Sequence, residues 1–288
     1  MALRIAPVLD EVAARLSGRP RTDRLRDPVG WAYALRDAVA VAEPAVVVSH
    51  LDGELEAAAL RAALAGGAHW SDRLLDAAPL ARTAPTAEAA ELVRTLVGVG
   101  RAGRPVAATL TGPWTVAARL APEVLGDAAH DAGAQAELAD LVADALAALL
   151  GAYAEAGASL VVVVEEGAGA LDDVDRAGAH RPLVRALAHH RLDGVLWLPD
   201  GVGADAVAGG YAAVARAWAG TGEPPAGGAV RLDPALWDQD PGAFAARWPA
   251  IAAAAERAGA DLVLSDGPVP GGAPAANLRA AAGVAAAA

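Results

Sequence analysis

Short runs of Val, Leu and Ala that end in a charged residue followed by Pro or Gly are the feature that most constrains how this chain can fold. The last quarter shows two of them: residues 229–233 end in Asp233-Pro234, and residues 261–266 end in Asp266-Gly267. In a parallel α/β barrel, strands of this kind carry side chains to the mouth of the active site. We therefore expect any functional groups at the strand ends.

Six runs have the length and apolar density of parallel strands that are covered on both faces. Helical patterns separate them, and Gly157 and Gly259 follow helix ends, where Gly adopts the left-handed conformation easily. The predicted strands are 45–50, 106–112, 159–166, 194–200, 229–233 and 261–266, and the predicted helices are 54–64, 86–99, 134–157, 181–188 and 240–258. Repeated βα units predict a parallel α/β protein, with a barrel as the favoured closure.

A complete (β/α)8 barrel needs two more strands than these. Residues 210–217 fit either a strand or a helix. The first 44 residues contain two predicted helices, 9–16 and 29–41, but no convincing opening strand. The prediction is an α/β, TIM-barrel-like fold that lacks or remodels its first strand, or that a partner subunit closes.

Length and charge narrow the class of protein. A chain of 288 residues without a linker suits one domain over residues 1–288. No apolar run approaches the roughly 20 residues that cross a bilayer, and Asp10 and Glu11 stand where a signal peptide would stay apolar. The net charge of −12 disfavours nucleic-acid binding, which depends on clustered positive charge. We expect an acidic, cytoplasmic protein that binds neither nucleic acid nor membranes.

The chain has no Cys and no Lys, so all 23 basic residues are Arg. A thiolate nucleophile, a disulfide, a zinc site with Cys ligands and a lysine Schiff base are therefore excluded.

Four segments, in this order along the chain, resemble the uroporphyrinogen decarboxylase superfamily, which includes cobalamin-linked methyltransferases and the catalytic half of cobalamin-independent methionine synthase. They are residues 16–24, residues 106–117 with Thr111-Gly-Pro-Trp114-Thr, residues 156–169, and residues 231–234 together with 266–278. The resemblance implies a TIM barrel with its site at the C-terminal face.

The chain also departs from that family. Residues 1–44 contain no Arg- and Gly-containing loop of the kind with which the decarboxylases grip substrate carboxylates, and Gly267 stands where the family has a His. The zinc site of the methyltransferase relatives, with His and Cys ligands, is impossible in its usual form. The resemblance thus implies the fold more firmly than the activity, and we do not expect tetrapyrrole decarboxylation.

Glu165 and Glu166 end a Val-rich strand. Successive strand side chains point to opposite faces, so one of the two should enter the barrel mouth and serve as general acid or base. The alternative is that both are solvated or pair with an Arg.

His50 and Asp52 follow the strand 45–50 at a spacing of two, which would place them on one face. An imidazole beside a carboxylate can relay a proton or hold a divalent metal. Alternatively, Asp52-Gly53-Glu54 is only a turn and a helix start.

The remaining candidates are substrate-binding residues. Arg231 is a candidate anion anchor, whereas Asp233 before Pro234 is favoured as a helix cap with which Arg231 could pair. Asp266 either faces the mouth or turns the chain. Trp114 is a candidate aromatic wall, with Thr111 in the same motif, and Trp70 lies with His69 and Asp72 in a candidate lid.

The leading functional hypothesis is lyase or proton-transfer chemistry on a small, anionic organic substrate, with Glu165 or Glu166 as acid or base, His50 and Asp52 as relay, and Arg231 as anchor. One alternative is methyl transfer with a divalent metal on His50, Asp52 and a Glu. The other is a non-catalytic subunit that pairs with a relative. No cofactor is predicted beyond that metal, and a homodimer or a complex with a related subunit is the expected assembly.

Overall fold

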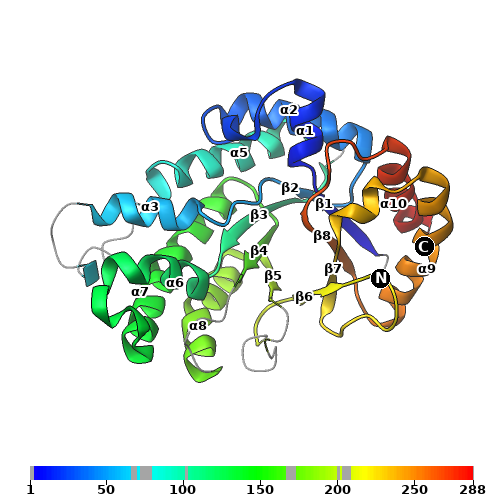
Figure 1. The fold of residues 1–288 in the computed structure, drawn as a ribbon. Coiled ribbons are helices and arrows are strands. Elements are labelled where there is room, and N and C mark those ends of the chain that lie inside the picture. The colour runs from blue at the N-terminus through cyan, green and yellow to red at the C-terminus, as the bar shows by residue number, and fades with distance from the viewer. Residues whose placement is uncertain are drawn as a thin grey trace.

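In the computed structural model, the residues described are 3–65, 70–71, 80–100, 103–166, 173–199, 202 and 209–287. Within them, eight parallel strands form a nearly closed barrel, and helices surround it (Figure 1). The strands are β1 Arg4–Val8, β2 Val47–Val48, β3 Val106–Thr111, β4 Leu160–Val164, β5 Asp193–Trp197, β6 Ala213–Trp218, β7 Gly228–Leu232 and β8 Leu262–Pro268. The TIM-barrel-like α/β prediction is confirmed.

The barrel has a seam between β1 and β2. The sheet runs in the order β1-β8-β7-β6-β5-β4-β3-β2, with no ladder between its first and last strands. Two backbone bonds cross the seam instead, from the N–H groups of Ala45 and Val46 to the carbonyl of Ile5, at 2.9 and 3.2 Å. The seam is therefore bridged but not sealed.

The expectation of a missing first strand was wrong. β1 pairs in parallel with β8, and its register shifts between Ala6 and Val8, on either side of Pro7. Proline has no N–H for a ladder and is tolerated at edges and bulges, so Pro7 made this stretch read as a loop. This chain's own N-terminus thus fills the place that the prediction left empty or gave to a partner.

Most predicted helices lie within a few residues of their expected bounds. Of the two possibilities for residues 210–217, the structure has the strand, β6, at residues 213–218. The helix α6 begins at Pro113, and no helix was predicted there. The helices are α1 Asp10–Ser17, α2 Pro28–Ala42, α3 Leu55–Leu64, α5 Thr86–Val99, α6 Pro113–Val124, α7 Ala132–Glu155, α8 Asp173–His190, α9 Pro241–Arg257 and α10 Ala275–Ala287, with short 3-10 turns η1 Arg21–Asp23, η2 Leu80–Arg82, η4 Gly126–His130 and η5 Pro234–Asp238. None of the helices in the described part of the chain could span a membrane.

Two apolar clusters show which way the strand side chains face. One cluster fills the barrel and consists of strand residues and Val46, which precedes β2; among them are Val162, Val164, Trp197, Ala229 and Leu264. The other joins alternate strand residues to the surrounding helices, among them Val161, Val163 and Val230. This alternation predicts the direction of each polar residue that continues a strand.

Candidate functional site

A pocket of about 340 Å³ lies at the carboxyl ends of the strands. Residues from five neighbouring strands or their ends line it, together with Leu51 after β2: Val164, Glu165, Glu166, Trp197, Pro199, Ala217, Arg231 and Asp266. This is the barrel mouth, where barrel enzymes carry their active sites. It is the candidate functional site.

Glu165 and Glu166 diverge as strand alternation requires. Val162 and Val164 face the barrel interior, and Glu166 continues that series. Its side chain is 48 % exposed and pairs with Arg119 of α6. Glu165 follows Val161 and Val163 and is fully buried on the helix side. Glu166 is therefore the carboxylate that the pocket presents to a ligand.

Glu165 binds the first turn of α6. Its carboxylate accepts hydrogen bonds from the backbone N–H groups of Trp114 and Thr115, at 3.2 and 2.9 Å, and from the Thr115 hydroxyl at 2.6 Å. A carboxylate at a helix N-terminus satisfies N–H groups that lack partners in the helix and faces the positive end of the dipole. Gly112 makes this approach possible, because a Cβ there would collide with the Glu165 carboxylate.

A buried hydrogen-bonded chain continues from Glu165 through His180 to Tyr211. His180 Nε2 lies 3.0 Å from Glu165 Oε1, and its Nδ1 lies 2.7 Å from the Tyr211 hydroxyl. An ionised carboxylate only accepts, so a neutral His180 carries its proton on Nε2 and accepts from Tyr211. Burial raises the pKa of Tyr211 well above its ordinary value, and Glu165 adds to the rise. His180 was not among the predicted site residues, because its partners lie 15 and 31 residues away in the sequence.

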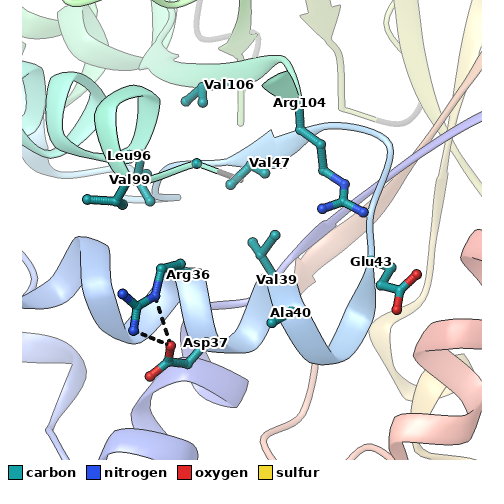
Figure 2. Close-up of a pocket in the computed structure, with 11 residues that line it drawn as sticks. Arg36, Asp37, Val39, Ala40, Glu43, Val47, Leu96, Val99, Arg104 and Val106 are labelled. Carbon is teal, nitrogen blue, oxygen red and sulfur yellow. Dashed lines mark hydrogen bonds and ion pairs between the residues drawn. The ribbon is translucent and has the colours of Figure 1, made fainter. Parts of the chain in front are cut away.

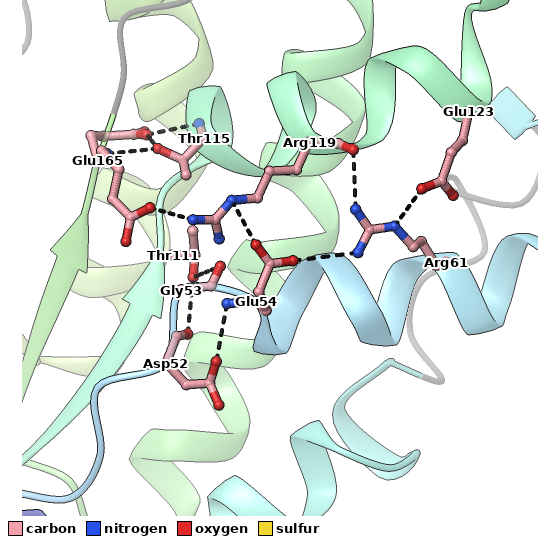
Figure 3. Close-up of polar contacts among 10 residues, drawn as sticks. Asp52, Gly53, Glu54, Arg61, Thr111, Thr115, Arg119, Glu123 and Glu165 are labelled. Atoms are coloured by element: carbon pink, nitrogen blue, oxygen red, sulfur yellow. Dashed lines mark hydrogen bonds and ion pairs between the residues drawn. The ribbon is translucent and has the colours of Figure 1, made fainter.

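Glu166 is held by a chain of ion pairs on the surface. Arg119 contacts Glu166 and also Glu54, at 3.2 Å, and Glu54 lies 3.4 Å from Arg61 (Figure 3). Arg61 continues to Glu123 of α6, at 2.8 Å. This network ties the start of α3 to α6 and fixes the direction of the pocket carboxylate.

Arg231 enters the opposite side of the mouth from β7. Its guanidinium lies 2.6 Å from Asp266, donates to the Leu198 carbonyl at 2.9 Å and stacks over the Trp197 ring at 4.4 Å. Arg231 is thus pre-oriented on one aromatic face and one carbonyl. Arg231 pairs with Asp266 and not with Asp233. Trp197 also lines the pocket, and it was not among the residues predicted from the sequence.

The other predicted binding residues lie outside the pocket lining. Asp233 is exposed and caps η5 by accepting from the Ala235 N–H at 2.9 Å, which confirms the capping interpretation. Trp114 is buried and packs edge-on against His180, so it forms no wall of this pocket. Buried Thr111 donates to the Gly53 carbonyl at 3.2 Å. Trp70 packs against the core, while His69 and Asp72 lie outside the described residues.

His50 does not face the mouth, and the expected relay with Asp52 is not formed. The ladder of β2 ends at Val48, so strand alternation no longer governs the next residues. The buried His50 ring lies 6.2 Å from Tyr153 of α7, toward the helices, and its Nδ1 is 2.8 Å from the Ser49 hydroxyl. Burial, with a smaller effect of Arg24, lowers the pKa of His50 to about 3. His50 is therefore a neutral, enclosed imidazole outside the pocket lining.

Asp52 pairs with Arg24, which lies between two carboxylates. Arg24 is 2.5 Å from Asp52 and 2.7 Å from the fully buried Asp10, and it donates to the Leu51 carbonyl at 3.3 Å. Burial raises the pKa of Asp10 and the Arg24 charge opposes that rise. This cluster joins the start of α1 and the residue after η1 to the segment after β2, at the carboxyl ends of the two seam strands.

No three His, Asp or Glu side chains in the described ranges come together as a metal site requires. Among these residues, no Glu joins His50 and Asp52 in the group that the methyl-transfer alternative would need. The nearby Glu56 is buried, and burial raises its pKa to about 7 against an opposing hydrogen bond from Thr111. It lies outside the pocket lining.

A family model and two solved structures match this chain. The family model described as Uroporphyrinogen decarboxylase (URO-D) matches residues 68–189. A methyltransferase from Methanosarcina mazei is similar in structure, with a TM-score of 0.68 and 13 % sequence identity over 99 % of this chain and 94 % of that chain. A crystal structure of 3-hexulose-6-phosphate synthase aligns with a TM-score of 0.36 and 14 % identity over 96 % of this chain and 99 % of that chain.

A search of curated proteins gave no match. The URO-D match covers α5, β3, α6, α7 and β4, and it includes the Thr111 to Thr115 motif and Glu165, which follows β4. The fold is similar to that of the Methanosarcina mazei methyltransferase over almost the whole chain. The match over residues 68–189 supports the resemblance of this chain to the uroporphyrinogen decarboxylase superfamily.

Proposed function

We propose that this protein is an enzyme that binds a small organic carboxylate at the barrel mouth and carries out acid–base chemistry on it. One observation carries the proposal: Arg231 and Glu166 enter the same pocket from inward-facing positions of β7 and the end of β4. A guanidinium binds a carboxylate through two parallel hydrogen bonds, and a carboxylate side chain can take up or deliver a proton.

Arg231 is the anion anchor in this proposal. The Leu198 carbonyl and the Trp197 ring hold its guanidinium in place, while Asp266 acts as counter-ion. The Asp266 side chain is 34 % exposed, so it can turn to solvent when a ligand carboxylate takes its place. Binding then exchanges one charge-assisted pair for another, and the fixed guanidinium loses little freedom.

Glu166 is the acid or base, and Glu165 positions it. The Thr115 hydroxyl accepts from the Glu166 N–H at 2.8 Å and donates to the Glu165 carboxylate. The backbone that carries Glu166 is therefore fixed by a buried, charged group. Glu166 would remove or return a proton at the carbon next to the bound carboxylate, as lyase and proton-transfer reactions require.

The size of the pocket limits the ligand. Ligand pockets commonly enclose roughly 300 to 1,000 Å³, and about 340 Å³ lies at the lower end of that range. A small organic acid suits this volume better than a macrocycle. We therefore name hydroxy acids and substituted malonates as the first substrates to test.

The test is proton exchange in D₂O. Purified protein is incubated with each acid, and proton NMR follows the loss of the signal from the carbon next to the carboxylate and the appearance of any decarboxylated product. We expect exchange or product with at least one acid, and we expect Glu166→Gln to abolish it. Arg231→Gln should raise KM, because the anchor charge is lost.

Arg216→Gln is the matched control, because Arg216 lies one strand away on β6 and does not line the pocket. It should leave both exchange and binding unchanged. Equal activity of Glu166→Gln and the unaltered protein would disprove the assignment of Glu166. Binding of an acid that depends on Arg231, with no exchange and no product, would favour a non-catalytic binding subunit.

Methyl transfer is the second candidate, and the similar fold of a protein described as a methyltransferase supports it. Incubation with a methyl-labelled corrinoid or folate donor tests it directly. Label transferred to a small acceptor by the unaltered protein, and lost with Arg231→Gln but not Arg216→Gln, would establish methyl transfer at this pocket. Label that stays on the donor would count against it.

A further inference from the structure

A second pocket, of about 450 Å³, lies at the opposite end of the barrel from the mouth. It is bounded by the starts of β2 and β3 and by the last turns of α2 and α5 (Figure 2). Val47 and Val106 are the first residues of their strands, so this pocket is separated from Glu166 and Arg231 by the length of the barrel. The proposed function uses none of its residues.

The inner surface of this pocket is aliphatic. Val47, Val106 and Leu96 are buried, and Val39 and Val99 are partly buried. Such a surface binds a branched hydrocarbon group by removing it from water, at roughly 25 cal/mol for each Å² covered. A site of this kind is specific only if polar groups at its edge fix the orientation of the ligand.

Arg104 is the first such group. It is partly buried, lines the pocket, and has no hydrogen bond or ion pair within the described ranges. Arg36, the other guanidinium here, donates from both Nε and a terminal nitrogen to the adjacent Asp37, at 3.0 and 2.7 Å (Figure 2). Arg104 is therefore the guanidinium that is available to bind a carboxylate.

Glu43 is the second polar group. It follows the last residue of α2 and has a φ of 50°, in the left-handed region that non-glycine residues rarely adopt. Such conformations are costly and gather at functional sites. Glu43 is exposed and lines the pocket, but it makes no ion pair with Arg104.

Two helices also end at this pocket. α2 ends at Ala42 and α5 ends at Val99, so both present the negative ends of their dipoles. Together with Glu43, these ends favour a cationic group on the ligand, whereas Arg104 favours an anionic one. The edge of the pocket thus offers both signs of charge beside an aliphatic surface.

We propose that this pocket binds a free aliphatic α-amino acid such as leucine. Its carboxylate would bind Arg104, its ammonium group would bind Glu43 and the helix ends, and its branched side chain would cover Val47, Leu96, Val99 and Val106. An aliphatic amino acid carries these three groups on one carbon, which is the combination that the pocket presents. The proposal is independent of the chemistry at the barrel mouth.

Isothermal titration calorimetry of the full chain with L-leucine tests the proposal. Two probes each lack one charge: 4-methylpentanoate has no ammonium group, and 3-methylbutylamine has no carboxylate. We expect saturable binding of L-leucine with a Kd of about 1 mM or tighter, and binding about tenfold or more weaker for each probe. No heat with L-leucine, or equal affinity for 4-methylpentanoate, would overturn the proposal.

Two variants separate the roles of the charged groups. Arg104→Gln should weaken L-leucine binding by about tenfold or more, and Glu43→Gln should remove the preference for L-leucine over 4-methylpentanoate. Arg94→Gln is the control, because Arg94 lies on α5 outside this pocket and pairs with Glu91. Thermal melting shows that each variant is folded, and unchanged binding by a folded Arg104→Gln protein would overturn the proposal.

Discussion

The imidazole of His180 on α8 and the carboxylate of Glu165 after β4 form a fully buried pair, with Nε2 and Oε1 3.0 Å apart. The same carboxylate accepts two backbone N–H groups at the start of α6. One side chain therefore attaches two helices to the end of one strand. The adjacent Glu166 remains directed to the pocket.

Glu165→Gln is predicted to destabilise the fold far more than Glu166→Gln. Removal of the buried charge leaves an amide N–H₂ facing N–H donors, and unsatisfied buried groups of this kind cost roughly 1–3 kcal/mol each. Glu166 is half exposed, and its pairing with Arg119 contributes about 1 kcal/mol or less. Urea unfolding of both variants measures the difference. Equal urea midpoints for the two variants would show that Glu165 does not hold α6 and α8 in place.

Gly112→Ala is also predicted to destabilise the fold, because it would disturb the hydrogen bonds between Glu165 and the start of α6. The added Cβ would occupy the space of the Glu165 carboxylate and push it away from the N–H groups of α6. Gly98→Ala is the control. Gly98 lies in helix α5, and a Cβ added there would meet no atom within 4 Å. That control should be neutral or more stable by up to about 1 kcal/mol. A melting temperature of Gly112→Ala at or above that of Gly98→Ala would contradict the prediction.

Glu56 is predicted to make the protein less stable as pH rises. Its pKa is 4.5 ordinarily and about 7 in the fold, chiefly because of burial. Between these values the folded chain keeps the proton and the unfolded chain releases it, so stability falls with rising pH, by on the order of 3 kcal/mol.

Glu56→Gln should therefore gain stability relative to the unaltered protein when the pH is raised from 4.5 to 8. Urea unfolding at both values gives this difference. Glu256→Gln on α9 is the control, because Glu256 is exposed. The prediction fails if both variants show the same pH dependence.

Arg24→Met is predicted to cost roughly 3–5 kcal/mol, because it leaves the buried Asp10 without its partner. Arg21→Met is the matched control, because Arg21 begins the 3-10 turn η1 that Arg24 follows. Arg21 pairs with Glu11 at 3.3 Å, with 39 % and 42 % of the two side chains exposed. Its loss should cost about 1 kcal/mol or less. Adding Asp10→Asn to Arg24→Met should restore part of the stability, and calorimetric melting compares all four proteins.

The sequence by itself determined the alternation of strands and helices and the positions of the polar strand ends. The near-continuous Val and Leu of residues 160–164 favour a strand covered on both faces, and Asp131 and Asp240 cap the helices that follow them. Alternation also predicted that Glu165 and Glu166 face opposite ways, because that depends on one strand alone.

Only the tertiary structure decided which partners these groups meet. His50 and Asp52 share a strand spacing, but the ladder of β2 stops at Val48, and beyond it the chain follows its packing against α7 and Arg24. Glu165 meets His180, and His180 meets Tyr211, across 15 and 31 residues. Local patterns fix backbone direction over a few residues, whereas these contacts depend on how whole elements pack, and so the site's partners emerged only in the fold.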